Sequence, residues 1–425
     1  MENDLAYIVN PNHTHDPPNI LAIRFRAKLI SESKNTTNSR VSLSAIYHSV
    51  HNQFTANADP NAVLDFPSFP TMQASMSRAR LSCIPKAPNT FAEISIAHLE
   101  DKFLYDNDSQ FFVADSGIYF TQNQPHISKR LIVFAAPDQD LARLGHVTKI
   151  DADGTFWTTP HLFYQLFTVH ANVYGQTFPF FYCLLPDKTE DSYEKAFAII
   201  SNVCRVKNIS LDSWSTISSD FEIAIHKGAK NVFPNINIRG CFFHYGQAIY
   251  NKVKSMGWAA VYKNDYSFYV SIRRLIALGM VPAPQKYRYF VEIYNDSTDP
   301  RYHKFCDDYF VRTWLIRYSQ NIWDWYNVQK RTNNDVEGWH NRLNKFFSTP
   351  HLSLYRFVAT LLEEAKRSSK DLQLRLAGAN LPRRNPVYQG INQQFVNLFG
   401  EFHVRLPLDY VDGFIHALAD PRNFD

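Results

Sequence analysis

The sequence predicts an α/β fold built on a mixed five-stranded sheet, with a helical insertion and flanking helical regions. First, residues 153–158, 162–170 and 177–185 form three β-rich, aromatic runs separated by short turns, which is typical of an antiparallel meander. Second, the chain then alternates helix, strand, helix and strand, an order that mixed α/β sheets produce. Third, residues 256–328 are dense in aromatics at helical spacing, which indicates a packed helical insertion.

Composition restricts the classes of protein to which the chain can belong. Its 425 residues suffice for two or three domains, and 45% hydrophobic with 15% aromatic residues excludes wholesale disorder. No apolar run is long enough to span a bilayer, and the N-terminus lacks the apolar stretch of a signal peptide. Five sparse, irregularly spaced cysteines favour a reducing compartment over a disulfide framework. A net charge of +4 permits a polyanionic partner without requiring one.

Two histidines, His13 and His15, stand out in the polar N-terminal region 1–45. Alone they cannot close a tetrahedral zinc site, and no cysteine precedes them, so their chemistry indicates a loop with two histidines. The surrounding His-Thr-His-Asp-Pro-Pro and the later Ile-Arg-Phe-Arg-Ala-Lys resemble the tail of a FLYWCH-type zinc finger, whose last two ligands are histidines. The resemblance implies a finger remnant plus linker. Zinc would need the complete finger, so we expect none to be held tightly here.

Residues 46–145 are predicted to be a mainly helical region in front of the sheet. Apolar residues recur at helical spacing over 41–58 and again over 72–81. Arg78 and Arg80 make this region basic, which suits a DNA-contacting module, and a plain packing domain explains the pattern equally well. Strands are predicted before the sheet over 105–120 and 131–136.

An acidic strand over residues 149–160 contains the first candidate site residue. Asp151 and Asp153 share one face because strand side chains alternate, and Gly154 leaves room for close approach to the backbone. Aspartate is depleted in strands, so carboxylates at these positions need an explanation. A solvent-facing edge would explain one such residue, but two later acidic sites favour a functional role.

Those two sites are Asp220 and Glu337. Asp220 ends a short predicted strand, where α/β sheets place ligands, and a helix N-cap explains it equally well. Glu337 lies on a predicted helix, where a carboxylate is ordinarily solvated. Together with Asp153 they suit two divalent ions, Mg²⁺ or Mn²⁺, about 3.5–4 Å apart, which stabilise the attacking and leaving oxygens in phosphodiester cleavage. Without metal, such a cluster would repel itself.

Four short blocks follow one another in an order shared with a known enzyme family. They are Asp153-Gly-Thr-Phe, Ser219-Asp220, Cys241-Phe-Phe-His244 and Glu337-Gly-Trp-His340. In this order they resemble the Mutator-like element (MULE) transposase family. The resemblance implies that the catalytic acids are Asp153, Asp220 and Glu337, and that the third block is the family's Cys-x-x-His signature.

The resemblance also implies a fold, an activity and partners. The fold would be ribonuclease-H-like, with an Asp/Asp/Glu transposase core at residues 146–350, the insertion at 256–328 and a helical C-terminal tail at 351–425. The activity would be metal-dependent cleavage and strand transfer of double-stranded DNA, in cut-and-paste transposition. Transposon terminal repeats and target DNA would be the partners, in the nucleus and away from membranes. A homo-oligomer on DNA is compatible with this activity.

Departures from the family pattern leave other functions open. The tail 351–425 contains no cysteine, so it lacks the zinc-binding SWIM segment that often follows the third acid. This loss and the shortened finger both weaken recognition of specific transposon ends by this chain alone. The intact acidic triad favours the transposase, whereas the shortened finger favours the alternative, a domesticated, transposase-derived DNA-binding or regulatory protein. A nuclease of the same fold that hydrolyses without joining is a third candidate.

Three residue assignments also have rivals. Asp151 competes with Asp153 for the first acid, although the family pattern places that acid directly before Gly-Thr-Phe. Cys241 and His244 supply only two zinc ligands without identified partners, so a packing role is the favoured one. The basic stretch 366–384 suits either phosphate contacts or a solvated helix face.

Overall fold

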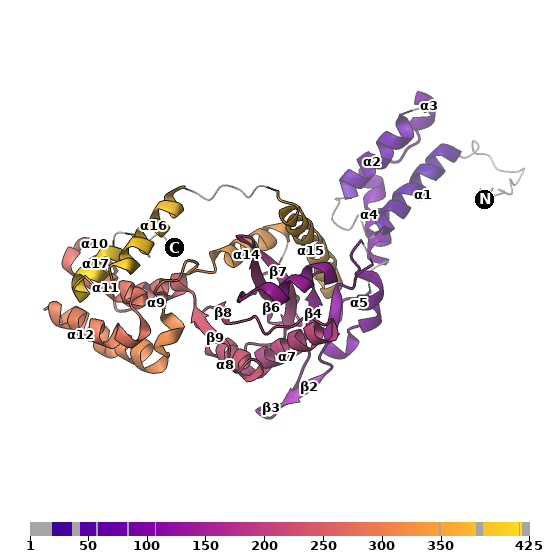
Figure 1. The fold of residues 1–425 in the computed structure, drawn as a ribbon. Helices are drawn as coiled ribbons and strands as arrows, with labels where there is room; N and C mark the ends of the chain where they lie inside the picture. Colours follow the sequence, from indigo (N-terminus) through magenta and orange to yellow (C-terminus); the bar gives the residue numbers. More distant parts are fainter. Residues whose placement is uncertain are drawn as a thin grey trace, which may run out of the picture. The chain divides into compact units, whose positions relative to one another are not determined.

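A computed structural model describes most of the chain and divides it into two compact units, residues 1–87 and 88–425 (Figure 1). His13 and His15 lie outside the described residues, so their predicted role is not addressed. Within the described part, no helix combines the length and apolar character needed to cross a membrane. The described residues are 19–35, 43–56, 58–82, 85–106, 108–347, 350–379, 386–415 and 417–418.

The first unit is helical and has its own small core. Phe25 is fully buried, stacks on Phe66 at 4.3 Å between ring centroids and meets Tyr47 edge-on at 5.7 Å. Asn19 caps the first helix by accepting two backbone N–H groups. The helical region therefore begins at Ile20, inside the segment predicted to be a finger remnant and linker. Its helices are α1 (Ile20–Lys34), α2 (Leu43–Thr55), α3 (Pro60–Val63) and α4 (Phe69–Ser82).

The second unit is mixed α/β, as predicted, but its main sheet has seven strands where five were predicted. The strand order is β1-β4-β7-β6-β5-β8-β9, so the five predicted strands are adjacent and two more extend the meander edge. β8 and β9 run parallel to β5, and the other pairs are antiparallel. The strands are β1 (Phe112–Asp115), β4 (Ile132–Ala135), β5 (Lys149–Thr155), β6 (Gln165–Val173), β7 (Gln176–Leu185), β8 (Thr216–Ser219) and β9 (Asn237–Gly240).

Shorter elements precede β5 and connect the edge strands. β2 and β3 form a separate two-stranded hairpin. These elements are η2 (Phe91–Glu93), α5 (Ile96–Lys102), β2 (Tyr119–Thr121), β3 (Gln124–Lys129), α6 (Asp138–Leu141) and η3 (Ala142–His146).

Helices cover both faces of the sheet (Figure 1). On one face Ile150 and Ala152 belong to a buried core with residues of α7 (Glu190–Val206) and α8 (Ile223–Val232). Because strand side chains alternate, Asp151 and Asp153 point to the other face. There they meet residues around α14 (Asn334–Phe346), while α15 (Leu354–Leu376) packs against β7. This second face is therefore where the candidate site must be sought.

Two strands end earlier than the sequence predicted. The first acidic strand stops at Thr155, because the Thr159 amide turns back to the carbonyl of Phe156. The last strand, for which the β-rich run 236–244 predicts an end at His244, stops at Gly240. Cys241 then becomes the N-cap residue of α9 (Phe242–Ser255), which places His244 in the first turn of a helix.

The insertion is helical, as predicted, and has a core rich in tryptophan. Trp314, Trp323 and Trp325 are almost fully buried there. The C-terminal helices α16 (Pro386–Gly400) and α17 (Pro407–Ile415) contribute to the same core. Arg273 joins them to it by donating to the carbonyls of Ile415 and Leu418 at 2.7 and 2.6 Å. The insertion comprises α10 (Ala259–Asn264), α11 (Tyr266–Ala277), η4 (Leu278–Met280), η5 (Ala283–Gln285), α12 (Lys286–Asp296), α13 (Pro300–Phe305), η6 (Cys306–Arg317) and η7 (Gln320–Trp323).

Candidate functional site

The parallel pairing of β5 with β8 brings Asp153 and Asp220 to the same end of the sheet. Asp151 pairs with Ser218, so two residues further along both segments the register reaches Asp153 and Asp220. The N-cap explanation for Asp220 is wrong, because α8 begins only at Ile223. Instead, burial raises the pKa of the Asp220 carboxyl to about 6, and the neighbouring charge of Asp153 contributes to the rise.

A chain of hydrogen-bonding groups holds the Asp153 carboxylate in place. Its Oδ1 accepts the N–H of Gly154 at 2.8 Å, and its Oδ2 lies 3.3 Å from Nδ1 of His340. The other ring nitrogen of His340 is 2.8 Å from the hydroxyl of Thr168, which is in turn 2.9 Å from Nε2 of His170. The carboxylate orientation is therefore fixed from both oxygens.

His340 belongs to the site, although no role for it was predicted from the sequence. It follows Glu337 by three positions on α14, so the two side chains lie on one face of the helix. That spacing was the available signal. The spacing indicates a role at the site only because α14 lies against β5 and β6, where Asp153 and Thr168 are.

Asp151, the rival for the first acid, has a different environment. Its side chain is 1% exposed, with Nζ of Lys330 at 2.8 Å and Nζ of Lys149 at 3.6 Å. Two lysines thus offset its charge. Among the described residues, Asp153 has no lysine or arginine in an ion pair, so its carboxylate is the one available to bind a cation.

Glu337 reaches the same end of the sheet from the first turn of α14. Its Oε1 lies 3.5 Å from Nε2 of His244. Burial raises the pKa of the Glu337 carboxyl; His244 opposes the rise, and the charge of Asp153 adds to it. Since Asp153 affects both Asp220 and Glu337, the structure brings the three predicted acids into one electrostatic neighbourhood.

Two oxygen atoms of this neighbourhood fit a cation. Oδ1 of Asp220 and Oε1 of Glu337 are buried and have no hydrogen-bond partner. Buried polar atoms normally have one, so unpartnered acceptors that face another carboxylate call for a positive charge. Carboxylate oxygens are ligands that suit Mg²⁺ or Mn²⁺.

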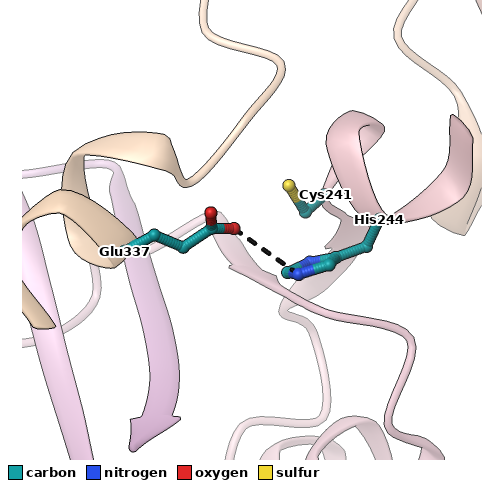
Figure 2. A group of neighbouring side chains, drawn as sticks. All are labelled: Cys241, His244 and Glu337. Carbon is teal, nitrogen blue, oxygen red and sulfur yellow. Dashed lines mark ion pairs between the residues drawn. The ribbon is translucent and has the colours of Figure 1, made fainter. Parts of the chain in front are cut away.

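The Cys-x-x-His pair lies beside Glu337 (Figure 2). The potential ligand atoms of Cys241, His244 and Glu337 all lie within 4.8 Å of one another. Cys241 is fully buried, and its Sγ accepts the N–H of Asn333 at 3.5 Å. Burial raises the pKa of this thiol to about 12. Glu337 is therefore a third potential ligand beside this pair, for which the sequence identified no partner.

A cleft of about 1640 Å³ borders α14 and the loop before it. Its lining contains four cationic side chains, but these already have partners within the chain. Arg331 bonds to the carbonyl of Val328 and to Asn392, and Arg342 pairs with Glu364. DNA phosphates would compete with these partners. The other two cations are Lys149 and Lys330, which pair with Asp151.

Three cations of the basic stretch 366–384 have partners within the protein, whereas Arg383 and Arg384 lie outside the described residues. On α15, Lys366 pairs with Asp106 at 2.5 Å, and Arg367 pairs with Glu364 at 3.4 Å. Arg375 donates to the carbonyl of Tyr174. DNA phosphates would compete with these partners for the three cations.

Comparison with known protein families matches residues 149–248 to the MULE transposase domain. The matched segment includes Asp153, Asp220 and the Cys-x-x-His pair, and it ends before Glu337. A search of curated proteins found no match. The domain match indicates a protein of the transposase type and implies DNA as its partner. The resemblance of the N-terminus to a FLYWCH finger remains a prediction.

Proposed function

We propose that this protein is a MULE-type DNA transposase, which cleaves and rejoins DNA strands. Its catalytic acids would be Asp153, Asp220 and Glu337. The observation that carries the proposal is the electrostatic coupling of these acids. They come from β5, the end of β8 and α14; burial raises the pKa of Asp220 and of Glu337, and the charge of Asp153 adds to both rises. Evolution tolerates such repulsion mainly where a cation or a reaction uses it.

The three carboxylates would hold two divalent ions, Mg²⁺ or Mn²⁺. Bound there, the ions would stabilise the charge on the attacking and leaving oxygens of a phosphodiester. The chain's own contribution is to position the ligands. His340 and the Gly154 amide orient Asp153, and the closing turn at Thr155 leaves its carboxylate at the strand end.

The proposed reaction has two steps, strand cleavage and strand joining, and each exchanges one P–O bond for another. In cleavage, water attacks the phosphodiester, one P–O bond forms as another breaks, and a DNA 3′-hydroxyl is released. In joining, that hydroxyl attacks a phosphodiester of the target DNA, and the displaced strand leaves with the second hydroxyl. Each P–O bond that breaks is replaced by a new one, so no nucleotide cofactor is needed.

The test is cleavage of end-labelled duplexes that carry the DNA flanking both sides of the protein's own gene, where terminal repeats would lie. We expect strand cuts that require Mg²⁺ or Mn²⁺ and that Asp153→Asn abolishes. Asp151→Asn is the matched variant, because its carboxylate pairs with Lys330 and Lys149. It should lose stability but still cut. Absence of cutting by the parent protein with either ion, together with retained DNA binding, would favour the domesticated DNA-binding alternative.

A further inference from the structure

We propose that Cys241, His244 and Glu337 form a binding site for a thiophilic transition-metal ion such as Zn²⁺, distinct in chemistry from the acidic site for Mg²⁺. The three residues offer one sulfur, one nitrogen and one oxygen ligand. This donor set is the one that Zn²⁺ uses in proteins, whereas Mg²⁺ prefers oxygen alone. The proposal concerns metal binding itself and does not depend on DNA cleavage.

The geometry of the ligands supports such a site. Their ligand atoms lie within 4.8 Å of one another, and Nε2 of His244 is 3.5 Å from Oε1 of Glu337 (Figure 2). Cys241 caps α9 and His244 lies in its first turn, so this short spacing points both side chains to one side. Glu337 approaches from α14 and faces them. A modest contraction would bring the three atoms around one ion.

The surroundings of the three ligands also fit a metal. Oε1 of Glu337 is a buried atom without a hydrogen-bond partner, and Nε2 of His244, the ring nitrogen that faces it, lies 3.5 Å away in an ion pair. The amide of Asn333 donates to Sγ of Cys241 at 3.5 Å, a contact of the type that orients metal-bound thiolates. A buried carboxylate oxygen that makes no hydrogen bond and has His244 as its ion-pair partner, beside an oriented thiol, leaves a place where a cation can bind.

Three protein ligands leave one position of a tetrahedral site open, as in zinc sites that keep a bound water. On binding, the thiol of Cys241 gives its proton to solvent, so the ion is held by a thiolate, an imidazole and a carboxylate. Glu337 would then belong to two sites. Where the proposed function holds, Zn²⁺ should inhibit Mg²⁺-dependent cleavage by removing Glu337 from the acidic cluster.

The experiment is a Co²⁺ titration of the metal-free, full-length protein, followed by absorbance. We expect one Co²⁺ per chain, with a thiolate-to-cobalt charge-transfer band and visible d–d bands of a tetrahedral site, all bleached by Zn²⁺. Cys241→Ser should abolish the charge-transfer band. His244→Ala and Glu337→Gln should each weaken Co²⁺ binding by at least about tenfold.

The matched control is Cys83→Ser, which removes the cysteine nearest in sequence to His13 and His15 and should leave the spectrum unchanged. A band that survives Cys241→Ser, or one lost on Cys83→Ser, would overturn the proposal, as would the absence of a band in the parent. If Cys241→Ser does not fold, the other two variants decide, because unchanged affinity in both contradicts the site. DNA cleavage is read separately, so the proposed function can fail while this site stands.

Discussion

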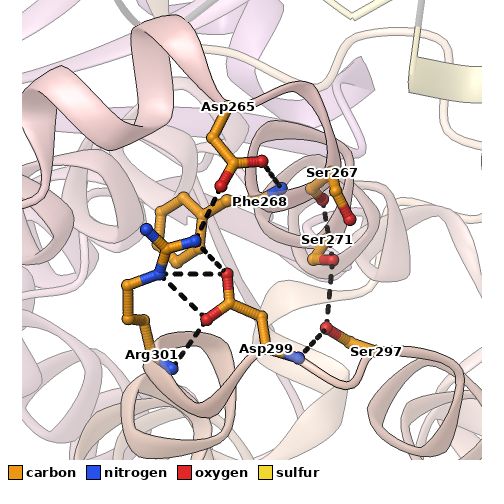
Figure 3. A network of polar contacts seen from close by, with 7 residues as sticks. All are labelled: Asp265, Ser267, Phe268, Ser271, Ser297, Asp299 and Arg301. Atoms are coloured by element: carbon orange, nitrogen blue, oxygen red, sulfur yellow. Dashed lines mark hydrogen bonds and ion pairs between the residues drawn. The ribbon is translucent and has the colours of Figure 1, made fainter.

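The carboxylates at the acidic end of the sheet and those of the helical insertion differ in how fully their charges are paired. In the insertion, Arg301 pairs with Asp299 at 2.6 Å and with Asp265 at 2.7 Å, and both aspartates also accept backbone N–H groups at helix starts (Figure 3). At the sheet end, Asp220 and Glu337 each keep a buried oxygen without a hydrogen bond, and the Glu337 oxygen has only a histidine in an ion pair at 3.5 Å. The first arrangement stabilises the fold, whereas the second costs stability and is retained where a cation or a substrate completes it.

The same contrast separates two neighbours on one strand. Asp151 is paired with two lysines, and Asp153 is held by a histidine and a backbone amide. A paired carboxylate has its charge offset within the protein. A carboxylate that is oriented but not neutralised is the type that binds metal.

The largest expected effect is on catalysis at Glu337. Glu337→Gln keeps the volume of the side chain but removes its charge, and several kcal/mol of transition-state stabilisation should be lost, on the order of 10³-fold in cleavage rate. DNA binding, measured by fluorescence anisotropy, should persist because it rests on dispersed, salt-sensitive phosphate contacts. The control is Asp335→Asn, which lies two residues away and pairs with Lys330. If Asp335→Asn stops cleavage while Glu337→Gln does not, the wrong carboxylate has been assigned.

A smaller loss is expected at His340. His340→Ala frees the carboxylate of Asp153 and should lower cleavage by about 10- to 100-fold, mainly by raising the Mg²⁺ concentration required for half-maximal rate. His340→Gln, which can still donate to Asp153, should recover part of the loss. A purely structural role would instead lower the melting temperature without changing the Mg²⁺ dependence.

At Asp220 the comparison predicts a gain in stability. Burial, with the charge of Asp153, raises its folded pKa to about 6, above the ordinary value, so the folded state disfavours the ionised carboxyl and stability is lost as pH rises from the ordinary pKa through about 6. Asp220→Asn should therefore stabilise the metal-free protein at pH 7, by about 1–3 kcal/mol, and the gain should vanish near pH 4. Urea unfolding at both pH values measures this. Equal stability of the two proteins at pH 7 would show that the folded protein does not disfavour the Asp220 charge.

In the insertion, removing an acid should have the opposite sign. Asp299 caps α13 by accepting the N–H of Arg301 at 2.8 Å. Asp299→Ala should destabilise the protein by about 0.5–2 kcal/mol through loss of the cap alone. Asp308→Ala, which removes a surface pair with Lys304, should leave the urea midpoint unchanged. If Asp299→Ala stabilised the protein, the acids of the insertion would cost stability as those at the sheet end do, and the predicted difference between the two regions would be wrong.

The sequence by itself determined the local elements and the acids worth considering. Alternation placed Asp151 and Asp153 on one face, and the order of strands and helices from residue 149 predicted a mixed sheet correctly. Aromatic density predicted the helical insertion. These features depend on side chains a few positions apart, so periodicity and short blocks reveal them.

Tertiary structure decided the rest, because the deciding partners are distant along the chain. Lys330, which marks Asp151 as the paired acid, lies 179 residues away from it. The extra strands β1 and β4 join the sheet only by pairing with one another and with β7. Cys241 and His244 acquire Glu337 as a neighbour only because α14 folds back over the start of α9. Contacts across such separations leave no periodic pattern in the sequence. Which carboxylate is paired and which is left unneutralised is therefore decided by tertiary packing.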